Sequence, residues 1–209
     1  MVRDTYADAI TSLYNEGYVF TRQEKGSMDQ TRSVRIDLSK FELSSENRRI
    51  LRKNEQLEMK RHNIPFANYV WSIGKLGKDF YDEKFGKGTF SANKMKEALT
   101  DEKNSNFTTL LIYSLHSEPV GYAICYENDD IFHYSYPFYN LNSELKNIGM
   151  GMMTRAVEYA KKSGKKYLYM GAAQRPTDTY KFQFLGMEWF DGNMWNTDMN
   201  ILKKIIVTV

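Results

Sequence analysis

Two glycines separated by one residue stand in the C-terminal half of this 209-residue chain, and they favour anion binding. Glycine lets the backbone approach a ligand closely, and the free amides of a helix's first turn attract phosphate. Such glycines also begin many ordinary helices, so this spacing alone leaves packing open as an alternative. The residues that we predict to contact donor phosphates are Lys146, Asn147, Gly149, Met150, Gly151 and Met152.

An amphipathic helix follows these glycines. Met153, Ala156, Val157 and Ala160 recur at helical spacing, and charged residues occupy the other positions. Gly164 is placed to end the helix in the left-handed conformation. A strand over 166–171 comes next. A strand, a helix and a strand after an antiparallel meander are typical of an α+β or mixed α/β protein.

A second cluster of cations lies near residue 50. Residues 45–62 hold six Lys or Arg against three Glu, and Ser44 is placed to cap a helix that begins at Ser45. On that helix, cations four residues apart form two adjacent rows. They suit contacts with a nucleic-acid backbone, although a solvated charged face explains the charges equally simply. The candidate tRNA-binding residues are Arg48, Arg49, Arg52 and Lys53.

Composition limits the classes of protein. The chain has a net charge of +3, 42% hydrophobic residues and one cysteine, Cys125. A disulfide framework and a cysteine-rich metal module are therefore excluded, and Cys125 is expected to be a small buried residue. His62, His116 and His133 show no metal-ligand spacing, so we predict no metal site. No secretory leader or apolar run long enough to span a membrane is recognised, which predicts a cytoplasmic protein with no membrane partner.

Hydrophobic patterning predicts an α+β chain with one domain over 1–209, in which 1–65 form an N-terminal elaboration carrying the basic helix. An irregular stretch runs to Gln30, and a β-hairpin joins 107–115 to 119–127. Leu57 is expected on the inner face of the basic helix, together with Ile50 and Leu51. The other expected helices are 4–16, one beginning at Ser91, and 177–184, and the other expected strands are 31–36, 131–139, 186–190 and 200–208.

The glycine motif resembles the acyl-CoA pyrophosphate loop of the GNAT acyltransferase superfamily. The later aromatic element resembles that superfamily too, with Phe182 where a tyrosine that protonates the leaving group is common. This resemblance implies a GNAT-like fold, whose central mixed, mostly antiparallel sheet is flanked by helices.

A narrower resemblance is to the aminoacyl-tRNA–protein transferases, the arginyl- and leucyl-transferases of the N-end rule. It rests on the run from Arg32 to Asn54, on the aromatic strand that ends at Asn140, and on the Tyr-Leu-Tyr-Met-Gly strand that ends at Gly171. The chain departs from the family pattern at Thr31, which stands in a cysteine position, at Asn140, which replaces Asp, and at Gly186, which replaces Pro. The family's cysteine-rich region is essentially absent.

The resemblance implies transfer of an aminoacyl group, Arg or Leu, from tRNA to a protein or peptide amino terminus, without a further cofactor. The predicted catalytic residues are Tyr139, Asn140, Tyr180, Lys181 and Glu188. Tyr139 and Asn140 are placed at the reacting carbonyl, Tyr180 and Lys181 opposite them, and Glu188 or water as the base. Each residue also has a plain structural explanation, as a packing aromatic, a solvated cation or a surface charge.

Two other functions stay open. The chain is also consistent with an N-acetyltransferase that uses acetyl-CoA to acylate a small amine or peptide, and the second glycine, Gly151, favours a CoA-type pyrophosphate. A GNAT-like binding module without activity is the third interpretation. Strong salt dependence of binding distinguishes a tRNA donor from CoA.

Overall fold

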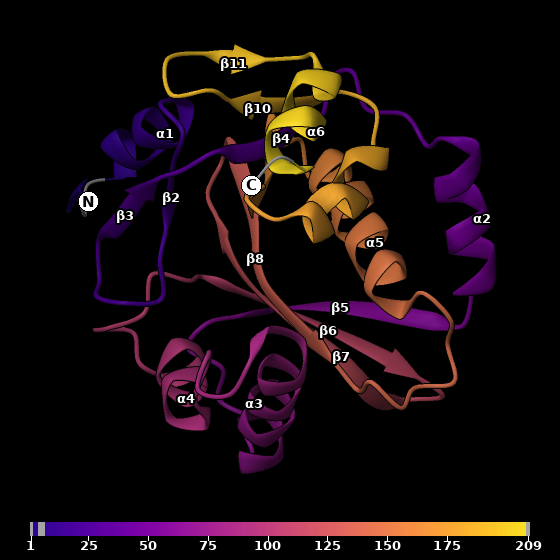
Figure 1. Cartoon of the computed structure of the whole chain (residues 1–209). Coiled ribbons are helices and arrows are strands. Elements are labelled where there is room, and N and C mark those ends of the chain that lie inside the picture. The colour runs from indigo at the N-terminus through magenta and orange to yellow at the C-terminus, as the bar shows by residue number, and fades with distance from the viewer. Residues whose placement is uncertain (1, 4–6, 208–209) are drawn as a thin grey trace.

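The computed structural model describes residues 2–3 and 7–207 and shows a twisted sheet with helices on both faces (Figure 1). Neighbouring strands are antiparallel except for the parallel pair β8 and β9. The predicted α+β class with a mixed, mostly antiparallel sheet is confirmed. In spatial order the eight strands are β11 (Trp195–Asn196), β10 (Met187–Phe190), β4 (Ser33–Asp37), β9 (Tyr167–Ala172), β8 (Ile131–Tyr139), β7 (Glu118–Glu127), β6 (Thr109–Leu115) and β5 (Leu57–Asn63).

Two apolar cores lie on the two faces of this sheet. The first core joins the sheet to α5 (Ile148–Lys162) and α6 (Met199–Val207), and α2 (Ser45–Lys53) packs beside α5. The second core joins the sheet to α1 (Ala7–Asn15), α3 (Trp71–Phe85) and α4 (Ala92–Thr100). A small sheet of β1 (Val2–Arg3), β3 (Ser27–Gln30) and β2 (Tyr18–Phe20) adjoins α1 (Figure 1).

The predicted hairpin and the strand after it form the meander β6–β7–β8. His116 and Ser117, with φ of 51° and 70°, make the two-residue turn that joins β6 to β7. Alternation sends Leu111 into the first core and Leu110 into the second, as expected for strands covered on both faces. Cys125 is fully buried on β7, as predicted from its apolar surroundings.

The crossover β8–α5–β9 produces the main irregularity of the sheet. The two strands pair only from Ile131 with Tyr167 to His133 with Tyr169. Two residues after His133, Ser135 is extra in the register between β8 and β7, because Ile124 pairs with Tyr136 and Cys125 with Tyr134. A bulge bends its strand and increases the twist. The strands therefore diverge toward their C-terminal ends, and we call this region of 134–139 and 170–172 the fork.

Helix α5 follows the predicted pattern. Met153, Ala156, Val157 and Ala160 are all buried in the first core. Gly164 adopts a φ of +73°, which supports its predicted place just after the helix. The apolar stripe is therefore what holds α5 across the sheet next to the fork.

Three sequence predictions about strands and the basic helix were incomplete or wrong. The basic helix ends at Lys53, so Leu57 belongs to β5 instead of the helix. Strand β5 lies at the edge of the sheet with one covered face, and an edge strand tolerates several charged residues. The stretch before Gln30 was predicted to be irregular and instead contains β2 and β3. Residues 33–63, assigned to the N-terminal elaboration, supply β4 and β5 to the large sheet.

The strand predicted over 200–208 is also wrong, because Met199–Val207 is the helix α6. Leu202 and Ile206 are buried one helical turn apart, whereas the isoleucines and valine had suggested a strand. The Asp198 carboxylate accepts hydrogen bonds from the amides of Asn200 and Ile201, at 2.9 and 3.4 Å, and so caps the helix. Part of the predicted helix 4–16 lies outside the described residues.

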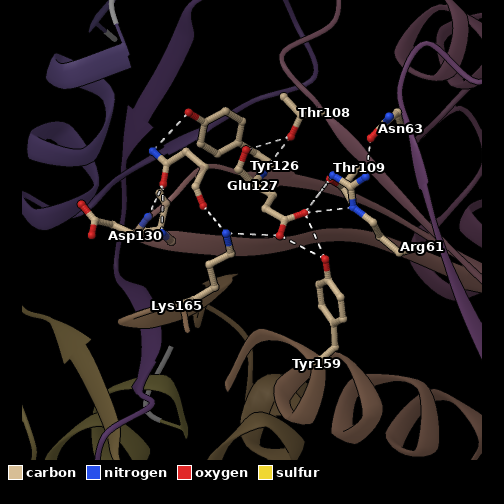
Figure 2. A network of polar contacts seen from close by, with 11 residues as sticks. Arg61, Asn63, Thr108, Thr109, Tyr126, Glu127, Asp130, Tyr159 and Lys165 are labelled. Atoms are coloured by element: carbon tan, nitrogen blue, oxygen red, sulfur yellow. Dashed lines mark hydrogen bonds and ion pairs between the residues drawn. The ribbon is translucent and has the colours of Figure 1, made fainter. Parts of the chain in front are cut away.

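A half-buried carboxylate fastens the C-terminal half of α5 to the meander (Figure 2). Glu127 accepts hydrogen bonds from Thr109 at 2.9 Å and from Tyr159 at 3.1 Å, and it pairs with Lys165 at 3.3 Å and Arg61 at 3.2 Å. Burial raises the pKa of Glu127, but the Thr109 hydrogen bond and the charges of Lys165 and Arg61 outweigh it and lower the pKa overall.

Replacing Glu127 with Gln is expected to lower the free energy of unfolding at neutral pH by about 1–3 kcal/mol, because Lys165 loses its buried counter-charge. A carboxylate whose folded pKa is lowered stabilises the fold above its unfolded pKa, and this contribution disappears as pH falls through the folded value. The difference between wild type and E127Q, measured by urea unfolding, should therefore shrink below the ordinary pKa of 4.5. Glu58→Gln, an exposed carboxylate on β5, is the control. A difference independent of pH would contradict the ionic explanation.

Candidate active site

The predicted phosphate-binding loop lies directly beside the fork. Asn147 precedes α5 with a left-handed φ of 63°, and Lys146 and Asn147 are both exposed. Gly149 packs on the Tyr139 ring, since a Cβ on this glycine would lie 2.9 Å from Tyr139 Cε1. The loop therefore touches the end of β8 that was predicted to face the reacting carbonyl.

The first turn of α5 leaves two amides for a ligand. The amides of Met150 and Gly151 both donate to the Asn147 carbonyl at 3.0 Å, and Met152 is fully buried inside the helix. Within the part of the chain that the structure describes, the amides of Ile148 and Gly149 donate to no protein acceptor. The amides that remain free to bind an anion are therefore those of Ile148, which was not in the predicted set, and of Gly149, which was.

Asn54 joins the basic helix to this loop. Its side-chain Nδ2 donates to the carbonyls of Ile50 at 3.1 Å and Lys146 at 3.3 Å, and its own carbonyl accepts from Arg155 at 2.8 Å. A Cβ on Gly151 would lie 2.8 Å from Asn54 Cγ. The last turn of α2 is thereby held against the start of α5, so the two predicted phosphate-contacting segments form one surface.

The four predicted tRNA-binding cations differ in their surroundings. Arg48 donates to the Leu43 carbonyl, and Arg49 pairs with Glu46 near the start of α2. Arg52 and Lys53 are exposed on the turn that Asn54 holds, and neither forms a hydrogen bond or ion pair with the described residues. These two are the cations best placed to meet an anion at the α5 loop.

Tyr139 lies at the fork, near enough to Tyr180 to affect the pKa of the Tyr180 phenol. Tyr139 is half-buried, its ring centroid is 4.8 Å from that of Phe80, and burial raises its pKa. Loss of hydration raises the pKa of Tyr180 to about 12, with smaller contributions from the Asp178 charge and from Tyr139. The phenol of Tyr180 is therefore protonated at neutral pH.

Lys181 reaches into the same region from η1 (Pro176–Gln183), a 3-10 helix. Its ammonium group donates to the Ala172 carbonyl at 2.6 Å and lies 3.5 Å from Asp178 Oδ1, and the residue is 7% exposed. Burial lowers the pKa of Lys181, and the Asp178 carboxylate opposes this effect. The alternative explanation of Lys181 as a solvated cation therefore does not hold.

Asn140 and Glu188 are placed differently. The Asn140 side chain closes a turn by accepting from the Asn142 amide at 3.0 Å. Glu188 lies on β10, which β4 and β9 separate from β8, and its carboxylate pairs with Arg35 at 2.8 Å and Lys40 at 3.5 Å. The structure thus unites Tyr139, Tyr180 and Lys181 but leaves Glu188 in a separate ion pair.

A buried histidine at the base of the fork was not among the predicted site residues. His133 Nδ1 is 2.8 Å from the Tyr14 hydroxyl, and burial, with a smaller effect from the Lys181 charge, lowers the pKa of His133 to about 3. The imidazole is therefore neutral. Asp178 was missed as well, although Pro176 followed by an acidic residue is a typical helix-start signal.

An open pocket of about 500 Å³ lies at the start of β4 and the ends of β9 and β10. Its position follows from β4 and β9, because Ser33 pairs with Ala172 and the Ala173 amide donates to the Arg32 carbonyl at 2.9 Å. Its mixed polar and aromatic lining suits the end of a peptide or another polar amine. The lining residues are Gln30, Thr31, Arg32, Gln174, Phe190, Asp191 and Gly192.

Among residues 2–3 and 7–207, no three His, Cys, Asp or Glu side chains are grouped to hold a metal ion. Over the same ranges, each helix is too short or too polar to cross a bilayer.

Comparison with known proteins supports the fold and the sequence resemblance. An aspartate/glutamate leucyltransferase of Ruegeria pomeroyi is 24% identical over 168 residues, which make up 78% of this chain. The chain spans 60% of the length of that relative. No protein-family model matches the chain. The predicted resemblance to aminoacyl-tRNA–protein transferases is confirmed at the level of sequence similarity.

Solved structures decide the fold. L-PGS of Bacillus licheniformis aligns with a TM-score of 0.53 at 14% identity, over 96% of this chain and 70% of that one. A GCN5-related glucosamine N-acetyltransferase region of a fungal multi-domain enzyme aligns with a TM-score of 0.50 at 12% identity, over 90% of this chain and 22% of that one. The chain has a GNAT-like fold. The fork, the crossover helix and the loop before it are the parts that position the candidate site.

Substituting Gly151 with Ala is expected to destabilise the contact between α2 and α5. Overpacking costs about 1–3 kcal/mol, and the higher helix propensity of alanine offsets about 1 kcal/mol of this. In Gly77→Ala, the matched helical control, the new methyl group meets only the mobile end of Met95, so a smaller loss is expected. Thermal and urea unfolding measure both.

A double-mutant cycle tests whether Asn54 is the cause. Removing the Asn54 side chain in the G151A background relieves the clash, so N54A and G151A together should cost less than the sum of the two single changes. Strict additivity would show that the Asn54 contact does not set the requirement for glycine.

Proposed function

We propose that this protein is an acyltransferase that moves an aminoacyl group from tRNA to the amino terminus of a protein or peptide. The observation that carries the proposal is the Asn54 junction, which joins the cations of α2 to the α5 loop, and that loop contacts Tyr139 at the fork. A phosphate-binding surface thus continues to the side chains that can act on an ester. Similarity to a leucyltransferase supports this interpretation.

The reaction requires an amine to attack an ester carbonyl. A carbon–nitrogen bond forms, the bond from the carbonyl carbon to the ribose oxygen breaks, the amine releases a proton and the ribose oxygen takes one up. A protein α-amine has a pKa of about 7.7–8.0, so roughly a tenth of it is already neutral at pH 7 and water suffices to accept the proton. Glu188 is held by Arg35, and we therefore assign it a structural role in the proposal.

Tyr180 is the proposed proton donor to the ribose oxygen. Its high pKa keeps the hydroxyl protonated, and it lies beside Tyr139 and next to Lys181 in the chain. The sequence resemblance left this step without a residue, because Phe182 occupies the position of the usual tyrosine. The Lys181 charge, in surroundings that hold little water, favours the oxyanion that develops during the attack.

The proposed acceptor site is the pocket at the start of β4, near the end of β9 to which Lys181 donates a hydrogen bond. Asp191 and the two glutamines can hold an amino terminus, and Arg32 suits an acidic first side chain. The acceptors in the name of the Ruegeria pomeroyi relative are aspartate and glutamate. Leucine is therefore the first aminoacyl group to test, followed by arginine, with peptides that begin with Asp or Glu.

Acetyl-CoA-dependent N-acetylation is the second candidate, favoured by the fold of the fungal N-acetyltransferase region. The second glycine no longer adds weight to it, because contact with Asn54 accounts for Gly151. The exposed pair Arg52 and Lys53 favours a polyanion that extends beyond a pyrophosphate.

The deciding experiment titrates the protein with leucyl-tRNA, arginyl-tRNA and acetyl-CoA at two salt concentrations, and then adds acceptor peptides. We expect salt-sensitive tRNA binding and transfer of the amino acid to a peptide. Replacing Arg52 and Lys53 together with Gln should weaken tRNA binding and reduce the slope of log K against log salt by about 2. Lys96→Gln, on α4 at the opposite face, is the control. Acetyl-CoA binding without tRNA binding would establish the second candidate instead.

Tyr180→Phe separates transfer from binding. The ring stays while the proton donor is lost, so the transfer rate should fall by about 100-fold with little change in donor affinity. Tyr18→Phe, on β2, serves as the control. Single-turnover transfer to peptide gives the rate, and an unchanged rate would remove Tyr180 from the mechanism.

A further inference from the structure

An exposed aromatic ring and a guanidinium group are in contact beside the fork, and a second exposed ring lies on the short helix that begins after this arginine. Phe85, the last residue of α3, is 47% exposed, and Tyr180 on η1 is 45% exposed. The Arg175 Cζ atom, at the start of η1, lies 5.5 Å from the centroid of the Phe85 ring. We call Phe85, Arg175 and Tyr180 the aromatic platform.

Contacts with Tyr81, and through Tyr81 with β8, fix the position of the Phe85 ring. The Phe85 ring stacks on Tyr81, with centroids 5.5 Å apart and planes inclined by 28°. The Tyr81 hydroxyl donates to the Pro137 carbonyl on β8 at 3.1 Å. An exposed aromatic ring fixed in this way loses little side-chain entropy when a flat ligand stacks on it.

Single exposed aromatics are ordinary on protein surfaces, and Trp71 at the other end of α3 is one of them, with 71% exposure. The platform differs because its members come from two elements and include a cation that faces a ring. Aromatic rings with an adjacent arginine are the usual surface on which unpaired nucleic-acid bases stack. Exposed Lys84 and Lys87 flank Phe85, and Asp82 nearby is paired with Lys78 at 2.7 Å.

The platform is also continuous with the proposed donor surface. From the α5 loop, Gly149 touches Tyr139, Tyr139 contacts Phe80, and Phe80 contacts Phe85 at 6.5 Å between centroids. On the other side, Tyr180 is followed in the chain by Lys181. A base on the platform would therefore lie close to the groups that act on the acyl carbon.

We propose that the aromatic platform binds the terminal adenosine of the donor tRNA, an inference that rests on the proposed function. In an aminoacyl-tRNA the adenine and the acyl ester are attached to the same ribose, so the base must bind near the reacting carbon. In acyl-CoA the pantetheine arm separates the adenine from the thioester. A base-stacking surface at the transfer site thus suits a tRNA donor and not the adenine of CoA.

The test compares a complete leucine tRNA with the same tRNA lacking only its terminal adenosine, both uncharged, by fluorescence titration. The wild type should bind the complete tRNA about 5- to 150-fold more tightly, the range that one stacked base provides. Phe85→Leu and Arg175→Gln should each reduce this preference while affinity for the shortened tRNA stays the same. Trp71→Leu, on the same helix, should keep the full preference.

The outcomes separate the two proposals. Equal wild-type affinity for the two tRNAs would overturn the platform and leave the aminoacyl-transfer proposal standing. Equal weakening of both tRNAs by F85L would also overturn the platform, since it would show general damage to the surface. Absence of tRNA binding by the wild type would overturn both. Thermal unfolding of each variant confirms that F85L and W71L remain folded.

Discussion

The short pairing of β8 with β9 is the constraint on which the rest of the site depends. Parallel strands joined by a helix normally pair along most of their length, but here the pairing ends at His133 and Tyr169. The extra residue Ser135 bends β8 away from β9. Without this divergence, the C-terminal ends of the two strands would lie side by side, and Lys181 could not reach the Ala172 carbonyl between them.

Close packing and ligand binding make the same demand on the start of α5. Gly149 and Gly151 have no side chains, and in the folded chain Tyr139 and Asn54 occupy the space that those side chains would take. The contacts bring β8, α2 and α5 together at one point, and this convergence leaves the first amides of α5 beside cations and a tyrosine. Packing therefore accounts for both glycines, and the same packing forms the surface that we propose binds an anion.

A GNAT-like fold does not by itself identify the acyl donor, because one fold supports different chemistries through the sites built on it. In this chain, exposed charges on α2 and flat, exposed side chains at the fork favour the nucleic-acid donor that we propose. Both features lie on elements that surround the crossover, whereas the crossover itself is common to the fold. We therefore expect donor specificity to depend on the residues that α2, α3 and η1 add to the shared core.

Much of the local structure could be predicted from the sequence. The apolar residues from Met153 to Ala160 recur at helical spacing and so predict a helix. The alternation in the meander predicts strands with two covered faces. Ser44 and Gly164 marked helix ends because their chemistry acts within one turn. The sequence predictions were wrong where long-range packing determines the secondary structure. Tertiary contacts hold the β-branched residues of α6 in a helix. Leu57–Asn63 forms the strand β5 because it pairs with β6.

The candidate site divides in the same way. The residue types of the site and the loop before α5 could be predicted from the sequence, because glycines, cations and tyrosines follow one another in short motifs. Which of them meet was decided by tertiary structure. Glu188 and Lys181 are close in sequence, yet pairing of β10 with β4 joins Glu188 to Arg35, and the turn of η1 buries Lys181 at the fork. Phe85, far from both in sequence, reaches Arg175 only because α3 packs against β8.

The sequence by itself determined the elements and the chemical groups that they carry, because those depend on neighbouring residues. Only the fold decided which groups share a site, because contacts between distant segments depend on how the whole sheet is assembled.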